Sequence, residues 1–206
     1  MAIDHFLKHQ RARTRTDWNF NILFDDQPQV AHYARQYRQP LDHAGLYPAV
    51  PGRWLHATVL RIGFIDAFSE DELLVVAARL EPKLAALKMP AFLLGQWWIW
   101  GGNPCIHFTP EDPLRELYDL VAEELVAVVG NDRLPQLSAS FTPHVSLAYS
   151  KTYHDETGLF NAMQSTRVQA VPVRVNRLSL VKQHVRNHFY AWDIVKEIPV
   201  GQLRQP

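Results

Sequence analysis

The sequence is poor in the features that mark several large classes of protein. It contains a single cysteine, Cys105, among 206 residues. An internal disulfide and a structural zinc site built from thiolates are therefore both excluded. No apolar run approaches the ~20 residues that a membrane-spanning helix needs. We expect a protein of the reducing cytoplasm, without membrane contact.

An excess of charge of one sign is also absent. Twenty-one basic and twenty-one acidic residues cancel to a formal net charge of zero. Tight, sequence-independent binding of long nucleic acids is therefore not expected, because it depends on a basic surface. Glycine-rich phosphate loops, serine elbows and the patterns around catalytic cysteines are missing too. Any nucleic-acid substrate should be small or bound locally.

The remaining composition is that of a folded globular protein. Apolar residues make up 47% of the chain and charged residues 20%, and the chain is long enough to bury a continuous core. Residues 1–16 are basic and have no apolar segment of the kind found in signal peptides, so we expect a flexible, solvated N-terminal arm. Nothing marks a linker in residues 17–206, which we expect to form a single domain.

Two helices are strongly indicated. Ser69 and Glu72 form a capping box at the start of the first, and Asp112-Pro113 begins a second that Gly130 ends. Both carry an apolar stripe at helical spacing. The first stripe is Leu73, Val76, Ala77, Leu80, Leu84 and Leu87, and the second is Leu114, Leu117, Tyr118, Val121, Leu125 and Val128.

The rest of the chain predicts mainly strands. We expect a short helix over residues 28–38, a loop rich in proline and glycine up to Gly52, and a short helix or loop over 155–163. Strands are expected over 17–24, around 56, over 92–100 and 105–109, around 144, over 171–181 and over 190–198. Strand and helix alternate in both halves, and each half has one histidine-bearing strand. This arrangement is compatible with a degenerate duplication.

Those two strands share a short pattern. The first reads His56-Ala57-Thr58 and the second His144-Val145-Ser146. Because alternate side chains of a strand share a face, the histidine and the hydroxyl of each pattern project together. Around the second pattern, Thr142, His144, Ser146, Ala148 and Ser150 fall on one face, and Phe141, Val145, Leu147 and Tyr149 on the other. One face should line a cleft and the other a core.

These residue types suit chemistry on a phosphate. Histidine exchanges protons near neutral pH, and a hydroxyl can donate a hydrogen bond to an anion. Two such strands facing each other across a cleft would supply a general base, a general acid and two hydroxyl donors for the non-bridging oxygens of a phosphodiester. The scheme needs no metal.

Other histidines and the tryptophans have simpler interpretations. The pattern also occurs at His107-Phe108-Thr109, where Pro110 follows, and we expect His107 to be an ordinary strand residue. His184 and His188 have the spacing of metal ligands on a helix, but they lie between two strands, so no metal site is expected. The tryptophans at 97, 98 and 100 could stack on bases, although packing in a core is favoured.

Paired in this way, the two motifs resemble the signature of the two-histidine (2H) phosphoesterase superfamily, which includes the 2'-5' RNA ligase and cyclic phosphodiesterase families. Gly63 follows the first motif, and Pro143 directly precedes the second histidine. The resemblance spans about residues 17–198. It implies an α+β, bilobal fold in which two antiparallel sheets, related by pseudo-twofold symmetry, form a central groove with helices packed outside.

The resemblance also implies roles for single residues. His56 and His144 take the acid and base roles, Thr58 and Ser146 contact the phosphate, and no cofactor is required. Many RNA-ligase-like members have an arginine after the second motif, whereas this chain has Ala148-Tyr149-Ser150-Lys151. We therefore expect a basic residue from elsewhere to steer the substrate, and the candidate is Arg186, in the loop before the last strand.

The expected function is that of a metal-independent phosphodiesterase or 2'-5' RNA ligase. Its partner would be an RNA end with a 2',3'-cyclic phosphate or a small cyclic nucleotide, and no protein partner is expected. The sequence leaves open which histidine is the base. One alternative is a non-catalytic module that binds RNA or nucleotides in the same groove. A second is a metal hydrolase that uses some of the ten histidines.

Overall fold

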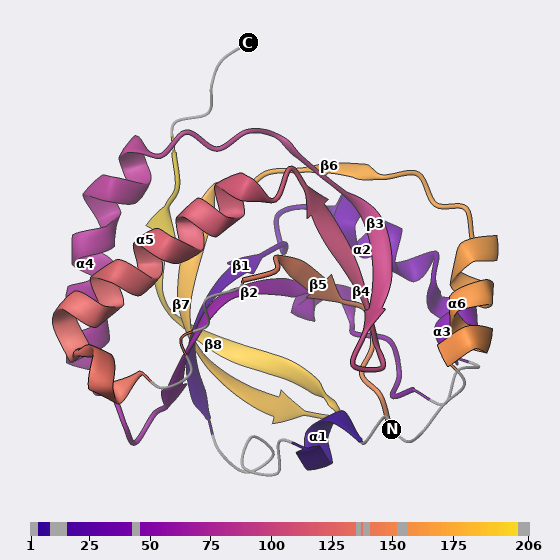
Figure 1. Ribbon diagram of the computed structural model, residues 1–206, viewed down its shortest axis with the longest axis horizontal. Helices are drawn as coiled ribbons and strands as arrows, with labels where there is room; N and C mark the ends of the chain where they lie inside the picture. The colour runs from indigo at the N-terminus through magenta and orange to yellow at the C-terminus, as the bar shows by residue number, and fades with distance from the viewer. Residues whose placement is uncertain are drawn as a thin grey trace.

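Two four-stranded antiparallel sheets form the centre of the molecule (Figure 1). The structure is a computed structural model that describes residues 4–8, 16–42, 46–134, 137, 141–151 and 156–201. The first sheet has the order β2 (His56–Phe64), β1 (Asp17–Leu23), β7 (Arg177–Arg186) and β8 (Phe189–Pro199). The second has the order β5 (His144–Ser146), β4 (Asn103–Thr109), β3 (Phe92–Trp100) and β6 (Val171–Val173). The two motif strands, β2 and β5, thus occupy equivalent edge positions.

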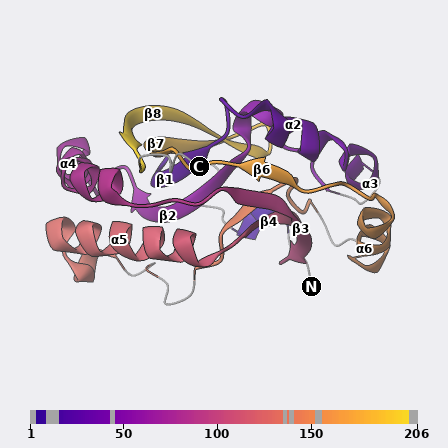
Figure 2. The same cartoon turned by 90° about the horizontal axis from the view of Figure 1, so that it is seen from above.

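The longer helices flank the sheets. Helices α4 (Glu70–Ala86) and α5 (Asp112–Val129) lie side by side at one end of the molecule in both views. Helices α2 (Pro28–Arg35), α3 (Arg38–Asp42) and α6 (Glu156–Ser165) lie toward the opposite end (Figures 1 and 2). Shorter turns are α1 (His5–Lys8), η1 (Gly52–Trp54) and η2 (Asn131–Arg133). The expected α+β fold, with two antiparallel sheets and helices outside them, is confirmed.

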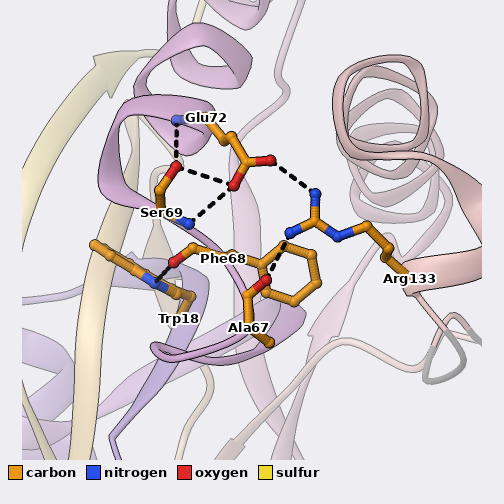
Figure 3. A network of polar contacts seen from close by, with 6 residues as sticks. All are labelled: Trp18, Ala67, Phe68, Ser69, Glu72 and Arg133. Atoms are coloured by element: carbon orange, nitrogen blue, oxygen red, sulfur yellow. Dashed lines mark hydrogen bonds and ion pairs between the residues drawn. The ribbon is translucent and has the colours of Figure 1, made fainter.

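The start of α4 shows how local sequence fixes an element. The Ser69 hydroxyl accepts a hydrogen bond from the Glu72 backbone at 3.3 Å, and the Glu72 carboxylate accepts one from the Ser69 backbone at 2.9 Å, so the predicted capping box is present. Arg133, in η2, donates to the Glu72 carboxylate at 2.7 Å, and the Trp18 indole donates to the Phe68 carbonyl at 3.0 Å (Figure 3). These bonds tie the start of α4 to β1 and to the segment after α5.

Both predicted apolar stripes are buried, and each differs from the prediction by one residue at the C-terminal end of its helix. In α4 the stripe is buried from Leu73 to Leu84, and Leu87 is the half-buried C-cap. In α5 Val129 is buried where Val128 was expected. The two helices and both sheets contribute to one continuous hydrophobic core. One polar side chain, Glu124 of α5, is buried where the helices meet.

The expected strand over residues 171–181 is wrong in one respect, because it is two strands in different sheets. Strand β6 pairs with β3, whereas β7 pairs with β1 and β8. The chain crosses between the sheets at residues 174–176. There the Gln27 side chain donates to the Arg174 carbonyl at 2.9 Å and accepts from the Arg174 backbone at 2.8 Å. This amide satisfies backbone groups that a continuous strand would have paired.

In three further segments the observed elements have different bounds from the predicted ones. Residues 28–38 form α2 and the start of α3 rather than one helix, and most of residues 155–163 belong to α6. Strand β5 ends at Ser146. Beyond it, the carbonyls of Leu147 and Tyr149 accept hydrogen bonds from Val50 and Tyr47, so the segment after the motif pairs with another loop.

The N-terminal segment also differs from expectation where the structure describes it. Residues 5–8 form α1, and the Phe6 side chain is 0% exposed. This part of the expected solvated arm is therefore packed on the domain. Residues 1–3 and 9–15 of the expected arm lie outside the described residues, and the division into an arm and a single domain over 17–206 stays a prediction.

Candidate active site

The four motif side chains meet in one cavity. His56 begins β2, His144 begins β5, and the two strands contact each other. The cavity has a volume of about 390 Å³. Its lining comprises His5, His56, Thr58, Trp100, Gly101, Asn103, Cys105, His144, Ser146, Tyr149, Ser150 and Tyr190. The structure therefore brings His56, Thr58, His144 and Ser146 together, although 88 residues separate the two motifs.

The alternation of each strand explains why these side chains share the cavity. Ala57 and Val59 of β2, and Leu55 just before it, are buried in the core on the opposite face, as expected. In β5, Val145 is fully buried between His144 and Ser146. The period of two residues thus directs each histidine and its hydroxyl away from the core.

The two histidines are held by the same backbone interaction. His56 Nδ1 lies 3.0 Å from the Trp54 carbonyl oxygen, and His144 Nδ1 lies 2.9 Å from the Thr142 carbonyl oxygen. A carbonyl oxygen can only accept a hydrogen bond, so Nδ1 carries the proton and donates it in both rings. In the neutral imidazole the lone pair is then on Nε2. Both histidines are therefore fixed in the same tautomer.

Aromatic rings surround the histidines. The His56 ring lies 4.8 Å from the Trp192 ring and 6.4 Å from the Tyr190 ring, between centroids. The His144 ring lies 5.0 Å from Trp100. His56 is 8% exposed. Rings at these positions limit the access of water to both imidazoles, which strengthens electrostatic interactions inside the cavity.

Burial shifts the proton affinity of both imidazoles in the same direction. Burial lowers the pKa of His56 to about 4, against the opposing effect of its bond to the Trp54 carbonyl, and a charge on His144 lowers it further. Burial likewise lowers the pKa of His144 below its ordinary value, again opposed by a backbone hydrogen bond. Both rings are therefore neutral at pH 7 when no anion is present.

The hydroxyls of the motifs are placed differently. Ser146 Oγ lies 3.8 Å from the Cys105 sulfur, because Cys105 is the cross-strand partner of Ser146. Burial raises the pKa of the Cys105 thiol to about 12, so the thiol stays protonated and is a poor nucleophile. Thr58 lies on β2, opposite Asn21 of β1, and is half-buried.

Arg186 is not brought to the cavity. It is the last residue of β7, paired with Phe189 across a two-residue turn, rather than part of a loop. The turn residues Asn187 and His188 both have positive φ, as this kind of hairpin requires. The Arg186 side chain is exposed and is not among the residues that line the cavity.

Several lining residues were not anticipated from the sequence. His5 belongs to the expected arm, Asn103 lies between the strands expected over 92–100 and 105–109, and Tyr149 belongs to the face expected to be core. Tyr190 lies on the last strand without any motif around it. No local pattern marks these positions, since they reach the cavity through strand pairing and through the packing of α1.

Of the other histidines and tryptophans considered from the sequence, Trp100 lines the cavity and the rest do not. His107 is buried in β4, with its ring 3.5 Å from that of Trp98. Trp97 packs against the core as expected, whereas Trp98 and Trp100 are 39% and 51% exposed on the opposite face of β3. The expectation that these tryptophans belong to the core therefore holds for Trp97 alone.

Neither a metal centre nor a membrane helix is found in the part of the chain that the structure describes. Within these residues, no three histidine, cysteine or acidic side chains are grouped as a metal site would require. His188 stacks on Tyr47, with 4.0 Å between ring centroids, and His184 lies within β7. Across the same residues, none of the helices combines the length and apolar character needed to span a bilayer.

The fold of this chain is shared by proteins of known structure. Solved structures with the same fold include TT0787 of Thermus thermophilus, at a TM-score of 0.68 and 16% identity, covering 89% of this chain and 97% of that one. E. coli LigT complexed with 3'-AMP aligns at a TM-score of 0.65 and 13% identity, covering 93% and 99%. E. coli LigT complexed with phosphate aligns at 0.62 and 12%, covering 91% and 99%.

One of the two sequence comparisons finds a match. The search of curated proteins finds no match. Residues 24–187, by contrast, match the sequence pattern of the 2'-5' RNA ligase superfamily. That segment includes both motifs, all four strands of the second sheet, strands β2 and β7 of the first sheet, and helices α2 to α6. With the paired histidines in one cavity and the shared fold, we conclude that the chain belongs to the 2'-5' RNA ligase superfamily.

Proposed function

We propose that the protein is a metal-independent phosphodiesterase that acts on RNA ends with a 2',3'-cyclic phosphate or on small cyclic nucleotides. The observation that carries the proposal is the equivalent anchoring of the two imidazoles. Each Nδ1 donates to a backbone carbonyl two residues earlier, and both rings line the same cavity. Each Nε2 is then the atom that can take up or release a proton.

The reaction follows from two histidines in opposite protonation states. The neutral imidazole removes a proton from water through Nε2 as the water oxygen attacks phosphorus. The bond from phosphorus to one ribose oxygen breaks, and the protonated imidazole gives its Nε2 proton to that oxygen. Positioned acid and base groups each contribute about 10² to 10⁴ in rate. The Thr58 and Ser146 hydroxyls donate to the non-bridging oxygens, where negative charge resides.

The lowered pKa values are compatible with this cycle when the substrate charge is included. A phosphodiester brings a negative charge between two buried imidazoles, and a nearby anion favours the protonated form of histidine. Substrate binding should therefore raise the pKa of the two imidazoles, so that one of them takes up a proton. The two protons then belong to a coupled pair, which gives a bell-shaped dependence of rate on pH.

The ligands of a related fold support a phosphate-bearing substrate. E. coli LigT has been solved in complex with phosphate and with 3'-AMP. A nucleoside phosphate is the class of molecule that two imidazoles and two hydroxyls would bind. The cavity of about 390 Å³ is within the usual size of small-ligand sites.

The test is hydrolysis of nucleoside 2',3'-cyclic phosphates and short cyclic-ended RNAs in excess chelator. We expect the wild type to turn over and His56→Ala and His144→Ala each to lose at least about 100-fold in kcat. The matched control is His32→Ala, because His32 is exposed on α2. Turnover that is indifferent to both substitutions would refute the mechanism. Phosphate binding without turnover would instead favour the non-catalytic binding module.

A further inference from the structure

The N-terminal segment supplies a wall of the cavity. Phe6 is fully buried, and its ring lies 5.2 Å from Tyr149 and 5.7 Å from Tyr190. The His5 backbone donates a hydrogen bond to the Ser150 carbonyl at 2.9 Å. The His5 ring also lies 4.6 Å from that of Tyr149. Packing of Phe6 and this backbone bond therefore hold the His5 side chain at the same cavity as the motif histidines.

A chain of hydrogen bonds fixes the tautomer of His5. The Ser150 backbone donates to Asn103 Oδ1 at 2.8 Å, which identifies the oxygen of that amide. Asn103 Nδ2 then faces His5 Nδ1 at 3.2 Å. An amide nitrogen only donates, so His5 Nδ1 accepts, and the proton of the neutral ring is on Nε2. His5 Nε2 lies 3.0 Å from Tyr190 Oη and donates to it.

The direction of this chain decides the role of Tyr190. Since Oη accepts from His5, the hydroxyl hydrogen must point toward a different acceptor. Within the described residues, His5 is the single hydrogen-bond partner of the Tyr190 side chain. Burial, and then the charge of Asp17, raise the pKa of Tyr190 to about 12, so the hydroxyl keeps its hydrogen at neutral pH. Tyr190 also lines the cavity, beside His56.

We propose that Tyr190 donates a hydrogen bond to a phosphate oxygen of the substrate, and that His5 is the positioning residue that orients this hydroxyl. The proposal deepens the function proposed above and rests on it for the identity of the substrate. It adds a donor outside both motifs. It also makes the N-terminal segment a functional part of the site.

The test is a double-mutant cycle on hydrolysis of a nucleoside 2',3'-cyclic phosphate. We expect Tyr190→Phe to lower kcat/KM about ten- to a hundredfold, as for a lost hydrogen bond to a charged group. His5→Ala should lower the same parameter, and the double variant should be no worse than Tyr190→Phe, because both substitutions remove one oriented donor. His5→Gln, whose amide can still accept from Asn103 and donate to Tyr190, should restore part of the activity.

Matched controls separate orientation from folding. His32→Ala and Tyr118→Phe alter side chains that do not line the cavity, and both should keep the wild-type kcat/KM. All variants are compared at a temperature at which circular dichroism shows them folded. Tyr190→Phe with wild-type kcat/KM would overturn the proposal, and so would losses from the two single substitutions that add in the double variant.

A binding measurement distinguishes failure of this inference from failure of the proposed function. The wild type, Tyr190→Phe, His5→Ala and the double variant are titrated with inorganic phosphate by calorimetry. If the wild type binds phosphate without turnover, the phosphodiesterase proposal fails, and the cycle is evaluated on the binding constant instead. The expected result is again a loss in Tyr190→Phe that His5→Ala does not increase. Absence of both turnover and phosphate binding would overturn both proposals.

Discussion

His56 and His144 have equivalent environments although they lie in different sheets. Each begins an edge strand, each donates Nδ1 to a carbonyl two residues earlier, and each is packed against aromatic rings. The carbonyl bond fixes which nitrogen exchanges protons, and burial sets how readily it does so. At the scale of the residue, the site is thus defined by backbone geometry as much as by the choice of histidine.

Burial of His56 predicts that the protein loses stability in mild acid. Its pKa is about 4 in the folded state, against 6.5 for an exposed histidine. The neutral His56 ring therefore makes its full contribution to the free energy of unfolding above pH 6.5. This contribution is lost as the pH falls toward 4, because only the unfolded chain takes up the proton in that range. The loss amounts to about 3 kcal/mol. Urea unfolding at several pH values would measure it.

The control is the same titration of His56→Gln, which has no titrating group at this position. We expect its unfolding free energy to fall less steeply between pH 6.5 and 4 than that of the wild type. His144 remains in this variant and retains its own contribution, because its pKa is also lowered. Equal slopes for the two proteins would contradict the buried, neutral state of His56.

At the scale of the element, a buried carboxylate joins α4 and α5. Glu124 is 3% exposed at its side chain, and it accepts from Arg79 at 2.6 Å and from Lys83. Hydrogen bonds from Lys83 and Arg79 outweigh burial and lower the pKa of Glu124. The carboxylate is therefore charged between two cations that are themselves half exposed.

We predict that Glu124→Gln destabilises the protein by about 2 kcal/mol, because it removes charge-assisted hydrogen bonds at a buried position. Chemical denaturation at neutral pH measures the effect. Glu123→Gln is the matched control, since Glu123 is the exposed neighbour on the same helix, and it should change the unfolding free energy by less than about 0.5 kcal/mol. Equal changes in unfolding free energy for the two variants would show that the ion pairs of Glu124 contribute no net stability.

At the scale of the whole molecule, the cavity lies where the two sheets meet. His56 comes from the first sheet and His144 from the second, and a single core connects the sheets with the helices. An anion bound between the two histidines would contact both sheets at once. Ligand binding should therefore stabilise the domain as one unit rather than one lobe alone.

We predict that inorganic phosphate raises the melting temperature in one cooperative transition. At about 100 times its Kd, a ligand that binds only the native state adds about 2.7 kcal/mol. For a chain of this length that corresponds to roughly 5 to 10 °C. Differential scanning calorimetry measures it. The variant His56→Ala/His144→Ala in the same buffers reports the general salt effect, and an equal shift in that variant would contradict binding at this site.

Much of the fold and the motif positions could be predicted from local sequence. The capping box at Ser69, the stripes of α4 and α5, and the alternation around His56 and His144 depend on neighbours a few residues away. Such patterns determine which side chains share a face, because the period of an element is fixed by its backbone. The resemblance to the family then placed the two motifs on opposite walls of a groove.

Other features were decided by tertiary structure alone. The strand expected over 171–181 is divided because Gln27, far away in sequence, pairs with the backbone at Arg174. Arg186 ends β7 and does not line the cavity, whereas His5 and Tyr190 do. These outcomes depend on which strand pairs with which, and on where a terminal phenylalanine finds a buried site. Local sequence determined the histidine motifs, but the packing of distant segments determined what surrounds them.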